Sequence, residues 1–444
     1  MAEKYYFIGI KGTGMGPLAQ ILHDQGNEVL GSDITSFTYT QAPLEAAGIK
    51  ILPFDAKNVD ANQDAIFIRG NAFDDDQVEV ARALELGVKM ITYPEAVEAQ
   101  IEQTTSISVA GAHGKTSTTG LLAHVLKNTA PTSYLIGDGT GHGVPNSEFF
   151  VVESDEYRRH FQDYTPDYAI LTNIDFDHPD YFHDIDDVRS AFQDFANHVK
   201  KAIFAWGDDP QLRKLTAKAD IYYYGTNPDR DDFVAENIHK STAGSHFDVS
   251  FRGKKLGEFS VPLYGQHNIL NALTVIAVCY TEKINLDYIR EHLMSYQGVK
   301  RRFSEKNIAD ITIIDDYAHH PTEISATLDA ARQKYPNKEI VAIFQPHTFT
   351  RVIAYKEDFA KSLEAADQVY LANIFGSARE KKGDITSADL GALIPKFRGI
   401  VTEDDVSALL PYENAVMVFM GAGDIQKYEF AYEKLLAQSR PNLI

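Results

Sequence analysis

The sequence predicts an α/β protein of three domains, each built on a mostly parallel β-sheet. Short β-type runs alternate with helical patterns along almost the whole chain, as they do in successive βαβ units. This pattern restarts twice, and a chain of 444 residues exceeds what one hydrophobic core normally serves. We therefore expect domains at residues 1–97, 98–298 and 299–444.

Composition narrows the class of protein and of partner. The sequence has no run of 18 or more apolar residues, the length needed to span a membrane, and its first residues lack the features of a signal peptide. We therefore expect a cytoplasmic chain without membrane insertion. The one cysteine, Cys279, lies in an apolar helical stretch and is expected to be a reduced core thiol. A formal charge of -21 opposes nucleic acid as a partner, so any phosphate must be held by a local site.

The first set of elements begins with the strand-like run YYFIGI and a helix expected from about Met15 to Gln25. Strands EVLGSD and AIFIRG follow, with a helix near Leu44 between them. The segment KGTGMGP runs from the end of YYFIGI into the first helix. It places backbone N–H groups at a helix N-terminus, where they can bind a pyrophosphate. A dinucleotide oxidoreductase is a weaker interpretation, because Pro17 stands at the third glycine of that pattern and a second phosphate loop follows.

That second loop opens the next set of elements. The strand SISVAG leads into Gly111-Ala112-His113-Gly114-Lys115-Thr116 and a helix over Thr118–Leu126. Glycines turn N–H groups toward a phosphate, Lys115 can reach its outer oxygens, and the Thr116 hydroxyl can bind Mg²⁺. Val109 replaces the first glycine of the general P-loop, so the spacing is the shorter G-x-x-G-K-T-[ST] form.

Acidic residues follow two further apolar strands of this set. The run VVESDE includes Glu153, the expected Mg²⁺ ligand, and strand Tyr168–Leu171 leads to the polar segment TNIDFDHPDY. Strand ends of an open parallel sheet are where ligands bind, so this segment is expected near the outer phosphate of a nucleotide. The residues alone allow an equally plain alternative, a solvated acidic loop.

The third set comprises the apolar strands ITIIDDY, EIVAIFQ, QVYLANI and AVMVFMG. The polar segment Pro94–Thr104 and the stretch Tyr296–Lys300 are the expected domain boundaries. A histidine cluster, His319, His320 and His347, suggests a metal site only weakly, because carboxylate or cysteine ligands at suitable spacing are lacking.

Six motifs in order, GAHGKTS, ESDEY, TNIDFDH, GQHNILNA, RRF and DDYAHHPTE, resemble the Mur ligase family along the whole chain. The resemblance implies Rossmann-like N- and C-terminal domains around a central P-loop ATPase domain that uses ATP and Mg²⁺. It implies magnesium ligands at Thr116, Glu153 and His178. It implies ATP binding by Ala110, Gly111, Ala112, His113, Gly114, Lys115, Thr116, Ser117, Asn268, Asn271, Arg302 and Asp316.

The N-terminal loop and strand GSD resemble the uridine-nucleotide site of the alanine-adding branch of this family. The implied UDP-sugar contacts are Gly12, Thr13, Gly14, Met15, Ser32, Asp33, Asn71 and Glu79. Asn71 departs from the more usual serine.

At the other end, DDYAHHPTEI and FQPHTFTR resemble the same branch and its close relative, the murein tripeptide ligases. His319 and Arg351 match positions that face the amino acid or the phosphoryl group, and Thr348 stands where many relatives have an arginine.

The activity that this branch implies is ligation of L-alanine to the lactyl carboxylate of UDP-N-acetylmuramate through an acyl phosphate. Lys115, Glu153, His178 and Arg302 would stabilise the transferring phosphoryl group, and His319 is the candidate base for the amine. Three alternatives stay open: a tripeptide ligase of murein recycling, a non-catalytic nucleotide-binding regulator, and a P-loop GTPase or motor. The last would need an Asn-Lys-x-Asp motif, which the sequence lacks. The oligomeric state cannot be read from the sequence.

Overall fold

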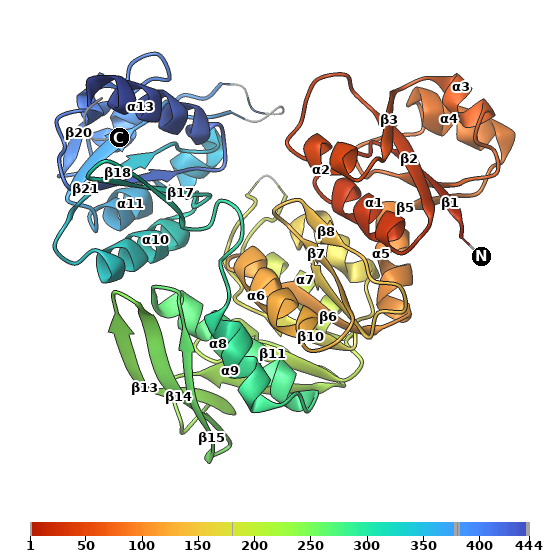
Figure 1. Cartoon of the computed structure of the whole chain (residues 1–444), viewed down its shortest axis with the longest axis horizontal. Coiled ribbons are helices and arrows are strands. Elements are labelled where there is room, and N and C mark those ends of the chain that lie inside the picture. Colours follow the sequence, from red (N-terminus) through yellow and green to blue (C-terminus); the bar gives the residue numbers. More distant parts are fainter. Residues whose placement is uncertain (1, 180, 377–379, 381, 441–444) are drawn as a thin grey trace.

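The computed structural model describes residues 2–179, 181–376, 380 and 382–440, and it arranges them in three α/β units (Figure 1). Each unit has its own sheet, and parallel pairing dominates all three. This architecture confirms the predicted fold class. Within the described residues, the structure contains no helix long and apolar enough to cross a membrane.

The N-terminal unit is an open, fully parallel sheet in the order β3-β2-β1-β4-β5. The strand order reverses beside β1, and such a switch point leaves a crevice at the carboxyl ends of the strands. The strands are β1 (Lys4–Ile8), β2 (Glu28–Asp33), β3 (Lys50–Pro53), β4 (Ile66–Arg69) and β5 (Met90–Thr92). The helices are α1 (Met15–Asp24), α2 (Gln41–Ala46), α3 (Ala56–Asp60), α4 (Val78–Leu86) and α5 (Tyr93–Glu102).

The central unit carries a ten-stranded sheet in the order β15-β14-β13-β12-β11-β10-β6-β9-β7-β8. Its middle is parallel, whereas β8 at one edge and the pair β14-β15 at the other are antiparallel. Its first five strands are β6 (Thr105–Ala110), β7 (Thr132–Ile136), β8 (Thr140–His142), β9 (Phe149–Glu153) and β10 (Tyr168–Leu171). The others are β11 (Ala202–Trp206), β12 (Asp220–Gly225), β13 (Phe233–Ser241), β14 (Gly244–Phe251) and β15 (Lys254–Val261). Its α-helices are α6 (Lys115–Lys127), α7 (Ile185–Ala196), α8 (Gln266–Thr281) and α9 (Leu286–Met294).

The C-terminal unit has a six-stranded sheet in the order β16-β17-β21-β18-β19-β20, with only β16 antiparallel. Its strands are β16 (Ser304–Ile308), β17 (Ile311–Asp316), β18 (Glu339–Phe344), β19 (Gln368–Leu371), β20 (Phe397–Ile400) and β21 (Ala415–Met420). Its α-helices are α10 (Pro321–Lys334), α11 (Phe349–Leu363), α12 (Ser387–Gly391) and α13 (Ile425–Ser439).

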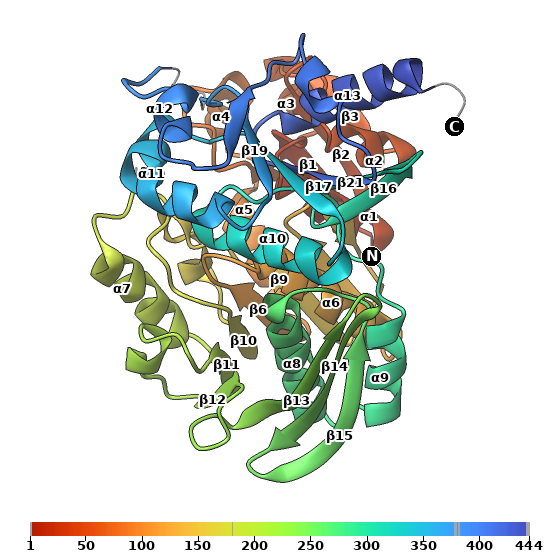
Figure 2. The same ribbon diagram turned by 90° about the vertical axis from the view of Figure 1, so that its left-hand side faces the viewer.

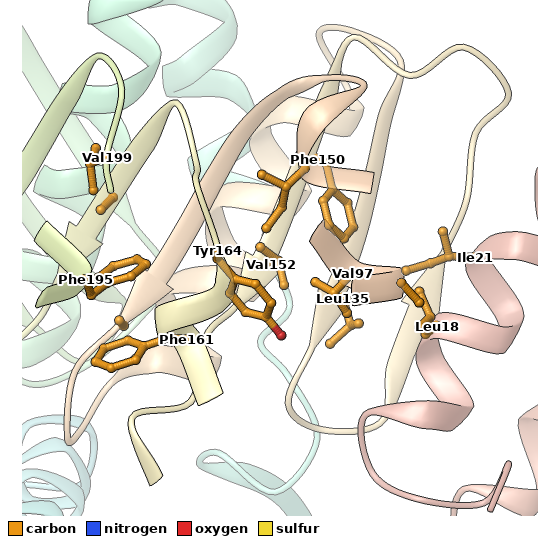
Figure 3. Close-up of a cluster of buried hydrophobic side chains, with 14 of the residues drawn as sticks. Leu18, Ile21, Val97, Leu135, Phe150, Val152, Phe161, Tyr164, Phe195 and Val199 are labelled. Carbon is orange, nitrogen blue, oxygen red and sulfur yellow. The ribbon is translucent and has the colours of Figure 1, made fainter. Parts of the chain in front are cut away.

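The first two units share one hydrophobic core. Leu18 and Ile21 of α1 are buried in the same cluster as Val97, Leu135 and Phe150 of the neighbouring elements, as Figure 3 shows. Apolar burial on this scale joins the N-terminal and central units into one packed body.

The C-terminal unit instead has cores of its own. Helix α10 contacts α8 and β13 of the central unit, and Figure 2 shows α10 lying above them. Polar side chains supply several of these contacts. Gln333, for example, donates to Ser241 O and Gly244 O and accepts from Gly265 N.

The segment Pro94–Thr104, expected to mark a domain boundary, is mostly helix α5. A capping box between Thr92 and Glu95 starts this helix, and its buried face includes Val97 and Ile101. The glutamates Glu95 and Glu102 are exposed, whereas Gln100 is buried and accepts a hydrogen bond from Gln25 Nε2 at 2.8 Å. The predicted boundary itself stays a prediction.

Candidate active site

The N-terminal phosphate loop lies between β1 and the start of α1, at the switch point of its sheet. Asp33 fixes this loop to the end of β2, because its carboxylate accepts hydrogen bonds from Lys11 N and Ile34 N, both at 2.7 Å. The Lys11 ammonium points away from the loop to Ile34 O and Ser36 O. The predicted contacts Gly12, Thr13, Gly14 and Met15 offer backbone groups at a helix N-terminus.

Two other predicted UDP-sugar residues lie behind this loop rather than on its surface. The Glu79 side chain is fully buried and accepts hydrogen bonds from Ser32 Oγ, Asn58 Nδ2 and Tyr6 OH. Glu79 thus orients Ser32, and a direct contact of Glu79 with a nucleotide stays a prediction. Asn71 is exposed at the end of β4.

The second phosphate loop connects β6 to α6 and is clamped by the end of β10. Thr172 Oγ1 and Asn173 Nδ2 both donate to His113 O, at 2.6 and 2.9 Å, and Asn173 Oδ1 accepts from His113 N. Gly111 and Gly114 have φ values of +143° and +83°, which other residues rarely adopt. These contacts fix the loop before any phosphate binds.

Lys115 begins α6 and already has an anionic partner. Its ammonium donates to Gly111 O at 2.5 Å and to both carboxylate oxygens of Glu156, at 2.9 and 3.1 Å. Burial alone would lower the pKa of Lys115, but Glu156 and Asp155 outweigh it and raise that pKa. Lys115 is therefore a permanent cation in the phosphate loop.

The three predicted magnesium ligands divide into two groups. Thr116 Oγ1 donates to Glu153 Oε1 at 3.0 Å, and Gly137 N donates to the other Glu153 oxygen at 2.7 Å. Among the residues that the structure describes, the carboxylates within ion-pair distance of His178 are Glu156, at 3.8 Å, and Asp177, at 3.9 Å. A hydroxyl beside a half-buried carboxylate is a fitting oxygen donor pair for Mg²⁺, whereas His178 belongs to a neighbouring group with Asp155 and Glu156.

A cavity of about 510 Å³ lies between the central and C-terminal units. The phosphate-loop residues His113, Gly114 and Ser117 line one end, and Trp206, Tyr224 and Pro262 contribute an apolar wall. The predicted pair Asn268 and Asn271 also lines it. Asn271 Nδ2 donates to Asn268 Oδ1 at 3.2 Å, so the two amides lie side by side on α8 as their spacing predicted.

Two predicted residues close this cavity from the C-terminal side. Arg302 NH1 lies 3.5 Å from Glu323 Oε1, and the guanidinium packs over the Tyr317 ring. Asp316 accepts hydrogen bonds from Phe303 N and Ala318 N, at 2.9 and 2.8 Å. Burial nevertheless raises the pKa of Asp316 to about 6. The cavity therefore joins the phosphate loop to an arginine and a carboxylate of the third unit.

The predicted acceptor residues lie at the outer end of the same interface. His319 Nδ1 faces Tyr317 O at 3.0 Å and Glu323 Oε2 at 3.1 Å, so a neutral ring keeps its lone pair on Nε2. Arg351 is buried on α11 and donates to Asp177 Oδ1 at 2.6 Å. The Arg351 charge is thus already paired across the domain interface. Thr348 precedes α11 and its hydroxyl contacts Thr350 Oγ1.

The histidines that weakly suggested a metal site, His319, His320 and His347, fall into two separate ring contacts. His320 stacks on His113, with ring centroids 4.4 Å apart, and both rings lie near Asp175. His319 and His347 meet edge to face instead. Burial lowers the pKa of His320 to about 4, which leaves this ring neutral near physiological pH.

Four acidic residues of the site were not singled out from the sequence: Glu156, Asp175, Asp177 and Glu323. Each lies in or directly beside a motif that was recognised. Glu323 carries one local signal, because it is the third residue of α10 after a proline and completes a capping box with His320. The partners of the other three depend on tertiary structure.

Comparison with known families agrees with this geometry. Residues 4–105 match the description "Mur ligase family, catalytic domain", residues 109–279 match "Mur ligase middle domain", and residues 301–424 match "Mur ligase, glutamate ligase domain". The three matches follow the order of the three sheets.

Individual relatives match along their full length. The chain is 80% identical to UDP-N-acetylmuramate–L-alanine ligase of Leuconostoc mesenteroides, with all of both chains covered. It is 60% identical to the ligase of that name from Ligilactobacillus salivarius, with 98% of each chain covered. The crystal structure of UDP-N-acetylmuramate-alanine ligase from Thermotoga maritima superimposes with a TM-score of 0.79 at 29% identity, covering 98% of this chain and 99% of that one. The chain therefore belongs to the Mur ligase family.

Proposed function

We propose that this chain joins L-alanine to the lactyl carboxylate of UDP-N-acetylmuramate, with ATP as phosphoryl donor, in peptidoglycan precursor synthesis. The observation that carries the proposal is the cavity of about 510 Å³, which joins a phosphate loop to Arg302 and Glu323 of another unit. Full-length identity of 60–80% with alanine ligases supports the choice of substrates. Because ATP is the donor, we place the reaction in the cytoplasm.

The two nucleotides would bind in separate units. The N-terminal loop would hold the UDP pyrophosphate through backbone N–H groups of Gly12 to Met15, with Asp33 fixing that loop. ATP would occupy the cavity, with its base beside Asn268 and Asn271 and its outer phosphates toward Lys115. The shared core of the first two units supports a fixed distance between the two sites.

Phosphoryl transfer would activate the lactyl carboxylate, which otherwise resists attack because oxide is a poor leaving group. Lys115 from the loop and Arg302 from the third unit would balance the charge that develops on the moving group. Thr116 and Glu153 would hold Mg²⁺, which when bound supplies additional positive charge to the phosphate oxygens. A role for His178 through its group with Asp155 and Glu156 belongs to the same proposal.

Amide formation would then need a deprotonated amine. His319 is our candidate base, since its Nδ1 side is held by Tyr317 and Glu323 and its Nε2 side can accept a proton. Closure of the third unit over the first two would exclude water, whose attack on the acyl phosphate would waste ATP. Arg351, anchored by Asp177, would contribute to this closure.

The test is a parallel acceptor assay. Purified protein is incubated with Mg-ATP and UDP-N-acetylmuramate, and single L-amino acids or an L-Ala-γ-D-Glu-diamino acid tripeptide are added separately. Phosphate release and product mass are measured. We expect product carrying one alanine and little from the tripeptide. Preference for the tripeptide would place the chain in murein recycling, and absence of phosphate release with every acceptor would contradict the ligase assignment.

A further inference from the structure

Glu323 occupies an unusual position in the first turn of α10. Its side chain is only 9% exposed, and Oε2 caps the helix by accepting from His319 N at 2.9 Å and His320 N at 3.3 Å. A capping role would require no more than this one oxygen. The second oxygen, Oε1, faces away from the cap.

The two oxygens together contact three groups that carry or can carry positive charge. Oε1 lies 3.5 Å from Arg302 NH1 and 3.6 Å from His113 Nδ1, while Oε2 lies 3.1 Å from His319 Nδ1. These partners come from the linker into the third unit, from the phosphate loop, and from the candidate base position. Their charges hold the pKa of Glu323 well below its usual range despite burial, so the carboxylate stays ionised.

His113 extends this arrangement into the central unit. Its other ring nitrogen, Nε2, lies 3.2 Å from Asp175 Oδ2, so one imidazole bridges a carboxylate from each of two units. Burial would lower the pKa of His113, but Asp175 and Glu323 outweigh burial and raise it to about 9. Asp177 and the stacked His320 also face this ring. His113 is therefore an imidazolium at neutral pH.

We propose that Glu323 is a positioning residue: its carboxylate binds His113, Arg302 and His319 together and so fixes the third unit over the phosphate loop in the geometry for reaction. The inference rests on the proposed ligase function. Glu323 touches no reacting atom itself, and it acts through the phosphate-loop histidine, the phosphate-side arginine and the candidate base.

The decisive variant is Glu323→Gln, which has nearly the same shape. Its amide oxygen can still cap α10, but its NH₂ group then faces Arg302 and His113, where a negative charge stood. The matched control is Asp329→Asn on the same helix, because Asp329 forms an exposed ion pair with Lys240 of the central unit at 3.4 Å. The control removes a cross-unit ion pair whose two side chains do not line the cavity, and thermal melting checks that both variants fold.

The first readout is independent of catalysis. Histidines of the full chain are labelled with ¹³C, the His113 signal is assigned with a His113→Gln variant, and its chemical shift is followed with pH by NMR. We expect wild type and Asp329→Asn to titrate near pH 9 and Glu323→Gln to titrate at least one pH unit lower. An unchanged His113 titration in Glu323→Gln would overturn the proposal, whatever the wild type catalyses.

The second readout is steady-state ligation. We expect Glu323→Gln to lower kcat on the order of 10- to 100-fold, because it removes a buried negative charge that pairs with Arg302 and His113, while the KM for the UDP-sugar changes little. Asp329→Asn should stay within about twofold, because exposed ion pairs contribute little. Equal losses in the two variants would reduce Glu323 to a general docking contact and refute its positioning role. If wild type forms no product, the proposed function fails, and the His113 titration still decides the charge link.

Discussion

The packing of α1 against β8 leads to a sharp prediction about Gly141. A Cβ atom at Gly141 would lie 2.1 Å from Pro17 O and 2.6 Å from Pro17 Cα, both in the backbone of α1. Backbone atoms of a helix cannot rotate aside as a side-chain tip can. Gly141→Ala must therefore push α1 away from the central sheet.

The size of the effect follows from this overlap. Restoring ordinary contact requires a shift of about 1 Å, and close-packed interfaces of this kind lose roughly 1–3 kcal/mol of unfolding free energy when overpacked. The shift falls on the core around Leu18 and Ile21, both fully buried, which joins the first two units. We expect the first thermal transition to fall by roughly 2–10 °C.

The assay compares Gly141→Ala with Gly16→Ala by calorimetry. Gly16 lies in α1 itself, but its added Cβ would meet its nearest neighbour, Ile10 O, at an ordinary 3.5 Å. Alanine also favours a helix over glycine by up to about 1 kcal/mol, so Gly16→Ala should be neutral or stabilising. Binding of a non-hydrolysable ATP analogue should be unchanged in Gly141→Ala, because no residue of α1 or β8 lines the cavity proposed for ATP.

A Gly141→Ala protein that melts with the wild type, with ligation also unchanged, would refute the reasoning. It would mean that α1 can move by an ångström without loss, and that the shared core does not set the spacing of the two proposed nucleotide sites. A fall in Gly16→Ala equal to that in Gly141→Ala would point to general sensitivity of the helix.

Three further predictions test other parts of the site. Lys115→Ala should abolish phosphate release and leave UDP-sugar binding nearly unchanged by calorimetric titration; comparable loss of both would contradict separate sites. Asp33→Ala removes the carboxylate that fixes the N-terminal loop, so the KM for the UDP-sugar should rise several-fold while that for ATP stays constant. Burial raises the pKa of Glu429 from 4.5 to about 7, so its stabilising proton is fully bound below pH 4.5 and is lost as the pH rises through 7. Glu429→Gln should therefore gain roughly 1–3 kcal/mol of unfolding free energy at pH 8.5 and little at pH 5 in denaturant titrations, and an equal gain at both pH values would exclude this explanation.

Local sequence patterns were sufficient for the fold class, and they correctly placed Lys115 at the start of a helix that follows a strand and a glycine-rich loop. Alternation of apolar runs, and glycines before Lys115, are properties of neighbouring residues, and parallel strands bring their carboxyl ends to one edge. Asn268 and Asn271 illustrate the same point, because their spacing on one helix already placed the two amides together.

Contacts between units could not be predicted in this way. His113 and Glu323 lie 210 positions apart, and their meeting depends on how the third unit docks on the second. Gly141 was not singled out from the sequence, although its lack of a side chain lets α1 approach β8. The sequence around Glu79 did not indicate that its carboxylate would be fully buried. Docking depends on whole surfaces, and the spacing of residues along the chain carries little information about it.

Charge pairing around the phosphate loop connects these contacts to binding. Lys115 is paired with Glu156, Arg302 with Glu323 and Arg351 with Asp177. In the proposed function, ATP would compete with carboxylates for Lys115 and Arg302. Its affinity would then be the difference between two sets of ion pairs, and each cation would contribute less than its charge suggests. The same ion pairs hold the three cations at fixed positions. They explain how a group of cations can stay together in a chain with a net charge of -21. Preorganisation of this kind favours a group whose charge develops only during transfer over one that is merely bound.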